Sequence, residues 1–161
     1  MDKRRSKIDY YLGIADAALE RSTCLRRRYG AIIVKDDEIV ATGYNGAPRG
    51  CQNCTDLGRC TRKELNVPAG ERYELCRSVH AEANAIISAS RRDMIGGTLY
   101  LVGRDAATGE LNPQTTSCAM CRRLIINAGI AKVISRIGKD EYVETDVQEW
   151  IEGDDPLNEK K

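Results

Sequence analysis

The sequence lacks the long apolar run that a membrane-spanning helix requires. No stretch of its 161 residues approaches the ~18–20 consecutive apolar residues that cross a bilayer. The charged start, residues 1–5, leads into an amphipathic segment rather than into the apolar core of a signal peptide. We therefore expect no membrane partner and a cytoplasmic location.

A large excess of charge of one sign is also missing. The 25 Lys and Arg residues nearly balance the 24 Asp and Glu residues, and the formal net charge is +1 at pH 7. Proteins that bind nucleic acid usually carry a clear basic excess. The basic run Arg26–Arg28 keeps nucleic-acid binding open without supporting it, so we expect no nucleic-acid partner.

Histidine is scarce, with one residue, whereas cysteine is abundant, with seven. Disulfide frameworks are typical of small secreted proteins, and this chain shows no export signal and is long enough for a core of its own. Cys24 stands alone and is interpreted as a small buried hydrophobic residue. The other cysteines cluster at Cys51, Cys54, Cys60, Cys76, Cys118 and Cys121. Two Cys-x-x-Cys pairs in a cytosolic chain indicate zinc.

The order of the predicted elements is helix, hairpin and two helix–strand units. Apolar residues at helical spacing and short β-branched runs carry this prediction. The predicted helices cover residues 8–25, 79–90 and 118–128, and the predicted strands cover 30–35, 39–44, 98–102 and 132–137. Residues 142–147 are compatible with an edge strand or with the start of a last helix. The order predicts one three-layer α/β domain around a mixed sheet over residues 1–161.

Two segments show no periodicity. Residues 45–77 are dominated by glycine, proline and cysteine, and a loop of this length should be functional or held by something other than a core. Its cysteines, as metal ligands, could hold it. The polar tail, residues 153–161, should be loose.

The strongest signal for function combines His80-Ala81-Glu82 with Cys118-x-x-Cys121, each at the start of a predicted helix. One imidazole and two thiolates leave the fourth position of a tetrahedral zinc ion open to water, which is typical of a catalytic site. The positive end of the helix dipole favours a thiolate over a thiol. Bound zinc would lower the pKa of its water to roughly 7, and Glu82 would carry the proton to the substrate.

These residues match the H-x-E…C-x-x-C signature of zinc nucleobase deaminases, in which proline precedes the first cysteine. Ser117 stands in the place of that proline, and serine can cap a helix as proline can begin one. A surface or core histidine, or a Cys-x-x-Cys pair without metal, would explain either half of the pattern alone. The joint pattern favours catalytic zinc.

The chain resembles the deoxycytidylate (dCMP) deaminases of the cytidine deaminase superfamily from about residue 8 to residue 151. Besides the zinc motifs, the resemblance rests on residues 43–50, G-Y-N-G-A-P-R-G, and on the cysteine-bearing insert, about residues 47–79. It implies a cytidine deaminase-like fold, with a central five-stranded mixed sheet and helices on both faces. It also implies hydrolysis of dCMP to dUMP and ammonia, which supplies dUMP for thymidylate synthesis, and a homohexamer regulated by dCTP and dTTP.

The resemblance assigns roles to individual residues. It implies Glu82 as the proton carrier, His80, Cys118 and Cys121 as ligands of the catalytic zinc, Asn45, Arg26 and Ala81 as substrate contacts, and Gly46 and Arg49 as effector contacts. Arg26 would meet the 5′-phosphate, although a solvated basic face explains it equally well. Asn45 and Gly46 can also be read as plain turn residues.

The insert cysteines form a second candidate set. Cys51, Cys54, Cys60 and Cys76 would complete a four-thiolate site, which is structural by its ligand count. Related deaminases often bind a second zinc in this insert, with ligands that vary. Disulfides are rare in a reducing compartment, and fully reduced cysteines would leave the insert without a core. We therefore predict one catalytic and one structural zinc ion per chain.

Two other functions remain open at this point. One is a deaminase of the same superfamily that acts on cytidine, guanine, a riboflavin precursor or the adenosine of a transfer RNA. The near-neutral charge argues against transfer RNA, and the insert argues against most of the others. The second is a non-catalytic interaction module held by zinc, which would have no use for a carboxylate at Glu82.

Overall fold

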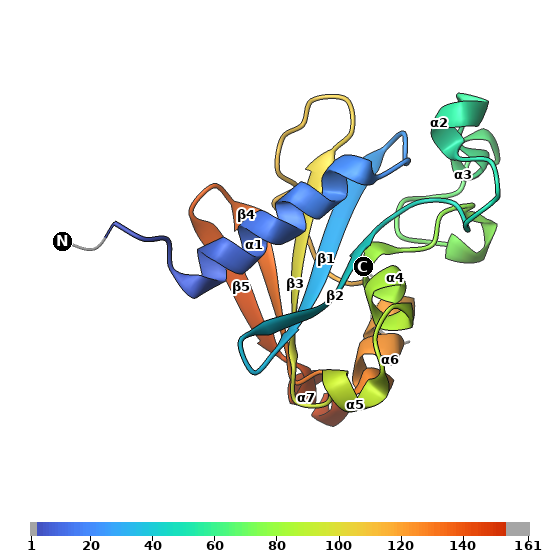
Figure 1. Cartoon of the computed structure of the whole chain (residues 1–161). Helices are drawn as coiled ribbons and strands as arrows, with labels where there is room; N and C mark the ends of the chain where they lie inside the picture. Colours follow the sequence, from blue (N-terminus) through green and yellow to red (C-terminus); the bar gives the residue numbers. More distant parts are fainter. Residues whose placement is uncertain (1–2, 154–161) are drawn as a thin grey trace.

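A mixed sheet of five strands, in the order β2-β1-β3-β4-β5, organises the molecule (Figure 1). The structure is a computed structural model and describes residues 3–153. The strands are β1 (Arg27–Lys35), β2 (Glu38–Tyr44), β3 (Thr98–Asp105), β4 (Lys132–Gly138) and β5 (Glu141–Asp146). Strands β3 and β4 are parallel, whereas the other neighbouring pairs are antiparallel.

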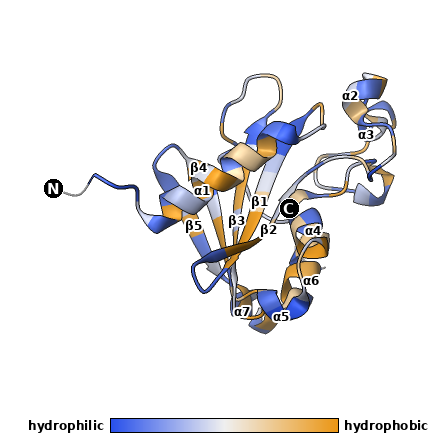
Figure 2. Cartoon of the chain, viewed as in Figure 1, coloured by the Kyte–Doolittle hydropathy of each residue, from blue (hydrophilic) through white to orange (hydrophobic). Residues whose placement is uncertain are grey.

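Helices cover both faces of this sheet (Figure 1). Helix α1 (Lys7–Ala18) packs on one face, and the other face carries α4 (Ala81–Ile87), α5 (Arg91–Met94), α6 (Ala119–Ala128) and α7 (Val147–Glu152). Alternate side chains of each strand point to opposite faces. Ile32 therefore packs towards α1 and Ile33 towards α4 and α6, in two separate apolar clusters. The predicted three-layer fold is confirmed, and Figure 2 shows its hydrophobic centre along β1 and β3.

The β1–β2 hairpin turns at Asp36 and Asp37, as the sequence predicts. Both residues have positive φ angles, 50° and 62°. Two consecutive positive φ angles define the type I′ turn, whose twist matches that of the flanking strands. This tight connection brings β2 alongside β1 and carries the chain back towards the end of the sheet where the insert begins.

The first helix is shorter than predicted, and the first strand is longer. Helix α1 ends at Ala18 and is followed by the 3₁₀ turn η1 (Leu19–Arg21), whereas the prediction extended the helix to residue 25. The prediction counted Leu25 as buried, and this side chain is exposed. Residues 27–29 instead pair with the end of β3, so β1 begins three residues earlier than predicted.

The second predicted helix, residues 79–90, is shorter, because α4 starts at Ala81 and a separate helix α5 follows. The insert, predicted to lack secondary structure, contains two single-turn helices, α2 (Cys54–Leu57) and α3 (Thr61–Glu64), and the 3₁₀ turn η2 (Tyr73–Leu75). Figure 1 shows these turns projecting beside the sheet, beyond the start of α4. A two-way backbone bridge between Gly46 and Val79 closes the base of the insert.

Both interpretations of residues 142–147 are partly correct. Strand β5 ends at Asp146, whose side chain caps the next helix by accepting a hydrogen bond from Gln148 N, and α7 begins at Val147. Of the tail predicted to be loose, residues 154–161 lie outside the described residues.

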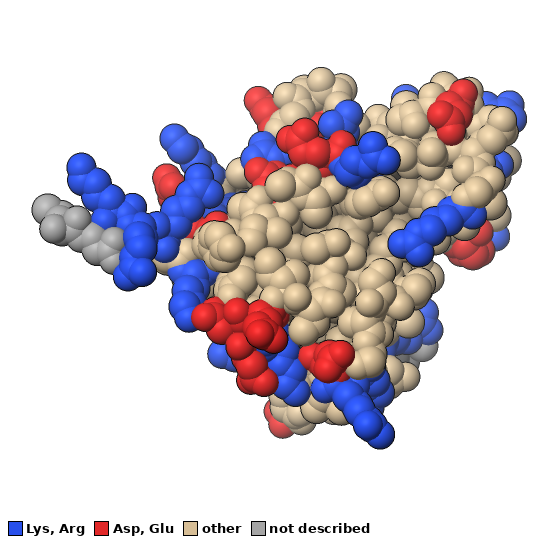
Figure 3. All heavy atoms as spheres, viewed as in Figure 1, with Lys and Arg blue, Asp and Glu red and all other residues tan. Residues whose placement is uncertain are grey.

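No helix within residues 3–153 combines the length and apolar character needed to span a bilayer. Over the face in view in Figure 3, acidic and basic side chains lie next to one another around a largely uncharged centre. This distribution agrees with the balanced composition.

Candidate metal centre and catalytic pocket

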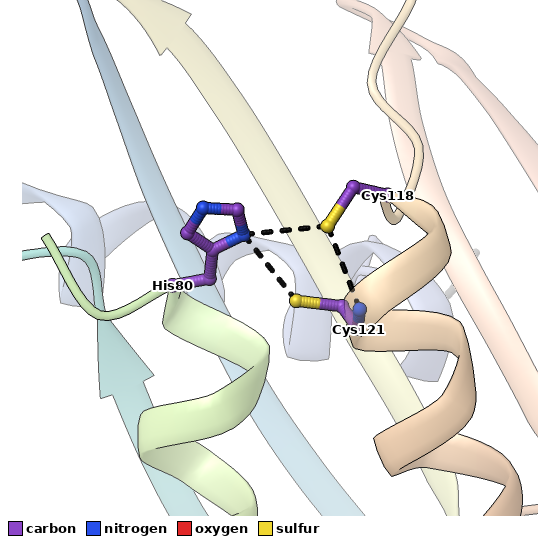
Figure 4. Close-up of side chains that lie close together, drawn as sticks. All are labelled: His80, Cys118 and Cys121. Atoms are coloured by element: carbon purple, nitrogen blue, oxygen red, sulfur yellow. Dashed lines mark hydrogen bonds between the residues drawn. The ribbon is translucent and has the colours of Figure 1, made fainter. Parts of the chain in front are cut away.

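The candidate site lies where two helices begin on the same face of the sheet (Figure 4). His80 is the N-cap residue of α4, and Cys118 is the N-cap residue of α6. The sequence reasoning placed His80 inside the first turn and gave the cap of α6 to residue 116 or 117. Both candidate ligands instead immediately precede their helices, and the Cys118 Sγ accepts a hydrogen bond from Cys121 N at 3.5 Å. The thiol thus serves as the cap.

A glycine sets the position of α4. A Cβ atom on Gly43 of β2 would lie 2.3 Å from the Ala81 carbonyl oxygen and 2.5 Å from Ala85 N. No side chain fits there, so the helix backbone lies directly on the strand. This close approach fixes the start of α4, and with it His80, relative to the sheet.

His80, Cys118 and Cys121 point towards one another (Figure 4). The His80 Nδ1 lies 3.5 Å from the Cys118 Sγ and 3.4 Å from the Cys121 Sγ. Among residues 3–153 these three form the one group of potential metal ligands whose donor atoms all lie within 4.8 Å of one another. One imidazole nitrogen and two sulfurs are a donor set that tetrahedral zinc prefers. The residues therefore fit a zinc ion with one position left open.

The two thiols and the imidazole strongly influence one another. The hydrogen bond with Cys121, and the neighbouring His80, lower the pKa of Cys118 to about 4. The pKa of Cys121 is raised by its hydrogen bond to Cys118 and by burial. Burial opposes the charged form of His80, but the Cys118 thiolate outweighs it, so the His80 pKa is raised. Metal binding here would release protons, since thiolates and a neutral imidazole are the ligand forms.

Glu82, in the first turn of α4, lines the same cavity as His80 and Cys118. Its side chain is almost fully buried, with 5% exposed. Burial raises the pKa of this carboxyl, although the nearby His80 acts in the opposite direction. A carboxyl that holds a proton readily and lies beside an open metal position can accept a proton and return it.

The cavity extends from this cluster towards the start of β1 and the insert. The remaining lining residues are Cys24, Arg26, Arg27, Tyr29, Asn45, Cys60, Arg62, Ala69, Gly70, Tyr73, Cys76, Ser78 and Thr116. Three arginines thus share one cavity with the candidate metal ligands. The cavity suits an anionic ligand that reaches from the metal position to the insert.

Asn45, for which the sequence analysis expects a substrate contact, is buried and lines this cavity. Its Oδ1 accepts hydrogen bonds from Ser22 Oγ at 2.5 Å and from Tyr29 N at 2.9 Å, and its Nδ2 donates to Arg27 O at 2.9 Å. An asparagine amide has two donor hydrogens and two acceptor lone pairs. One donor hydrogen therefore remains, so Asn45 both holds the strand entry and can donate one bond to a ligand.

The other predicted contacts fall in different places. Arg26 is exposed and lines the cavity, whereas Ala81 is fully buried in the core and is not among the lining residues. Gly46 is buried, and its backbone forms the bridge with Val79, which gives this residue a structural role. Arg49 is exposed beyond that bridge.

The four insert cysteines do not meet as a cluster comparable to the catalytic one. Cys51 is exposed, Cys54 is buried, and Cys60 and Cys76 line the cavity. The sequence reasoning set Cys24 aside as a small buried residue, but it is half-buried and lines the same cavity. Burial raises the pKa of the Cys54 thiol, and the neighbouring thiols of Cys24, Cys76 and Cys60 raise it further.

Sequence reasoning also missed Arg62 and Tyr73 in the insert. Both line the cavity, and they lie eighteen and seven positions before His80 in a segment without periodicity. An arginine and a tyrosine in such a segment carry no signal of their own. Their place in the cavity becomes visible only from the path of the insert in the folded chain.

The comparisons with known proteins agree with this geometry. Residues 5–137 match the family described as the cytidine and deoxycytidylate deaminase zinc-binding region. The chain is 40% identical to a deoxycytidylate deaminase of Mycobacterium phage D29 over 130 residues, which covers 78% of this chain and 91% of the phage protein. It is 32% identical to the human deoxycytidylate deaminase over 139 residues, covering 86% of this chain and 67% of the human protein.

Some relatives are much longer. The chain is 35% identical to the deoxycytidylate deaminase of Schizosaccharomyces pombe but spans only 37% of that protein. Among solved structures, the dCMP deaminase of cyanophage S-TIM5 matches with a TM-score of 0.57 and 27% identity, over 83% of this chain and 84% of that one. A second structure of the cyanophage enzyme, in complex with dCMP and dUMP, matches with a TM-score of 0.54 and 26% identity over 83% of both chains. Together with the His80, Cys118 and Cys121 cluster, these matches show that the chain belongs to the zinc-binding cytidine and deoxycytidylate deaminase family.

Proposed function

We propose that this chain hydrolyses dCMP to dUMP and ammonia, as a zinc-dependent hydrolase of the cyclic amidine in the cytosine ring. The observation that carries the proposal is the buried Glu82, which shares one cavity with His80 and Cys118 of the candidate metal cluster. The cavity also contains arginines, which suits a nucleotide rather than a nucleoside. The similarity of the chain to deoxycytidylate deaminases of phage and eukaryotic origin supports the same substrate.

The candidate ligands His80, Cys118 and Cys121 would hold the catalytic zinc ion. When bound there, zinc supplies an activated water, because it lowers the pKa of a coordinated water from 15.7 to roughly 7. Glu82 would accept one proton from that water and pass it to the ring nitrogen next to the amino-bearing carbon, as the water oxygen bonds to that carbon. Glu82 would then move the second proton of the same oxygen to the amino nitrogen, whose bond to carbon breaks to release ammonia. Its burial removes competing water, so the proton stays on the path between carboxyl and substrate.

Other residues orient the nucleotide. The one uncommitted donor hydrogen of Asn45 is available to the sugar or the base. Arg26, which is exposed and lines the cavity, would contact the phosphate end of the substrate from the solvent side. The single domain of residues 1–161, with the insert of residues 47–79, would thus place the base at the metal and the phosphate near the insert. Ala81 would act only through its backbone, because its side chain is fully buried.

The insert would hold a second, structural zinc ion through Cys51, Cys54, Cys60 and Cys76. Single-turn helices separated by long loops have little core of their own, and a metal ion would supply the missing stability. Cys24 lines the cavity with Cys60 and Cys76, and it is the alternative to the exposed Cys51 as the fourth ligand.

The family resemblance extends the proposal to regulation and cellular role. The chain would assemble as a cytoplasmic homohexamer that supplies dUMP for thymidylate synthesis. The effectors dCTP and dTTP would bind near Gly46 and Arg49. The backbone of Gly46 already pairs with that of Val79. Of the two predicted effector contacts, the exposed Arg49 would therefore be the one that binds the effector phosphates.

Incubation of the purified chain with dCMP, dCTP, cytidine and deoxycytidine tests the substrate directly. Loss of cytosine absorbance and release of ammonia should be fastest with dCMP. A site that pairs a phosphate with buried donors discriminates strongly against a ligand without it, so kcat/KM for dCMP should exceed that for deoxycytidine at least about a hundredfold. Equal efficiency on the two would assign a nucleoside deaminase instead.

A further inference from the structure

Arg62 of α3 is a buried cation that has no carboxylate partner among the described residues. Only 7% of its surface is exposed. Its Nη2 donates to the backbone oxygens of Pro68, at 3.2 Å, and Glu71, at 2.8 Å. Within residues 3–153, no acidic group lies within 4.0 Å of its guanidinium nitrogens as an ion-pair partner.

Such a charge is unfavourable in the free protein. Burying an ionised group is costly unless an opposite charge or a full set of hydrogen bonds compensates for it. The Nε of Arg62 is buried and makes no hydrogen bond to any described residue. Backbone carbonyls therefore offset only part of the cost, and an anionic ligand would remove the remainder.

The position of Arg62 connects it with the catalytic centre. It lines the cavity that contains His80, Glu82 and Cys118. Its guanidinium carbon lies 4.4 Å from the centre of the Tyr73 ring. Tyr73 in turn contacts the candidate zinc ligand His80: the centres of the two rings are 4.8 Å apart, and the interplanar angle is 88°. One aromatic ring separates the buried charge from a candidate zinc ligand.

Two other arginines line the cavity, and both differ from Arg62. Arg26 and Arg27 are exposed, so solvent already compensates for their charge. A buried arginine, held in one orientation by two carbonyls and a stacked ring, loses little conformational freedom when it binds a phosphate. Discrimination is also greater at a buried group, because a ligand without the phosphate leaves the charge unpaired.

We propose that Arg62 is the specificity-determining residue of this deaminase, which binds the phosphate of the nucleotide substrate across the Tyr73 ring from the metal site. The proposal rests on the proposed function and deepens it. It makes the insert part of the catalytic pocket, since α3 supplies the group that separates nucleotides from nucleosides.

The test measures kcat/KM for dCMP and for deoxycytidine in the zinc-loaded wild type and in Arg62→Gln, Arg62→Lys and Arg59→Ala. In Arg62→Gln the value for dCMP should fall at least about thirtyfold, mainly through KM, while deoxycytidine changes less than about threefold. Arg62→Lys keeps the charge but loses the planar guanidinium group, so its kcat/KM for dCMP should fall about tenfold. Arg59 is the matched control, because it is an exposed arginine of the same insert that does not line the cavity. Arg59→Ala should change kcat/KM for either substrate less than about threefold.

Inhibition by dUMP and deoxyuridine gives a second readout. In Arg62→Gln, inhibition by dUMP should be at least about thirtyfold weaker, and inhibition by deoxyuridine should be unchanged. A folded Arg62→Gln variant that keeps the wild-type preference for dCMP would overturn the proposal. Failure of both Arg62 variants to fold would overturn it as well, because the buried charge would then serve the fold. Wild type without activity on dCMP would instead reject the proposed function itself.

Discussion

Glu82 is buried and lines the same cavity as the candidate metal ligands His80 and Cys118, and its function should be separable from metal binding. We predict that Glu82→Gln keeps the zinc ion and the fold but loses about 10²–10⁴ in kcat on dCMP. The amide preserves the shape of the side chain and can still form hydrogen bonds, but it cannot accept the proton. Metal analysis and steady-state kinetics of the same preparation check both parts.

The control for this change is a ligand variant. His80→Ala removes one of three donor atoms at this site, so it should lose both the catalytic zinc and the activity. A Glu82→Gln enzyme that retains more than a few per cent of wild-type turnover would contradict the proton-carrier role.

At the level of secondary-structure elements, the site depends on how closely α4 lies on β2. We predict that Gly43→Ala destabilises the fold by about 1–3 kcal/mol, because the new methyl group would meet the helix backbone at 2.3 Å. The displaced helix start should also weaken zinc binding at His80. Denaturant unfolding and a zinc competition titration measure the two effects.

Gly13 in α1 is the matched glycine. A Cβ atom there approaches only the flexible end of Arg5, at 3.0 Å, and the residue lies inside a helix. Gly13→Ala should therefore leave zinc binding unchanged and stabilise the fold by about 0.5–1 kcal/mol. Equal unfolding free energies for the two variants would show that the contact between α4 and β2 can relax.

The insert is the element that most needs an added source of stability. We predict close to two zinc ions per wild-type chain and one in Cys60→Ser, whose insert should become sensitive to protease and whose Tm should fall. Comparison of Cys51→Ser with Cys24→Ser identifies the fourth ligand, because only the true ligand variant should lose the second ion. One zinc per wild-type chain, lost on mutation of Cys118, would exclude the second site.

For the whole molecule, the outer faces of α4 and α6 show large apolar side chains. Ile87 is 70% exposed, and Met120 and Leu124 are also exposed. We predict that the protein has the mass of six chains in light scattering, and that a double substitution, Ile87→Glu with Leu124→Glu, dissociates it. Buried carboxylates are costly at an interface but harmless on a free surface. A wild-type mass of one chain would exclude the hexamer.

The sequence by itself determined the layers of the fold and the candidate metal ligands. Strand and helix periodicities report which side of an element is buried, so the three layers around a mixed sheet follow from local pattern. The spacing of His80 and Glu82, and of Cys118 and Cys121, carries the chemistry because each pair joins a helix N-cap to the first turn that follows it. Relations between residues two or three positions apart can be recognised directly in the sequence.

Only the tertiary structure decided which distant residues share the pocket with these ligands. Leu25 fits a helical pattern, yet strand pairing of residues 27–29 with β3 ends the helix early. The insert has no periodicity, so nothing in its sequence shows that Arg62 and Tyr73 cross the cavity beside His80, or that Cys24 lies with Cys60 and Cys76. The physical reason is that burial and charge compensation depend on contacts between segments, and these exist only once the chain has folded.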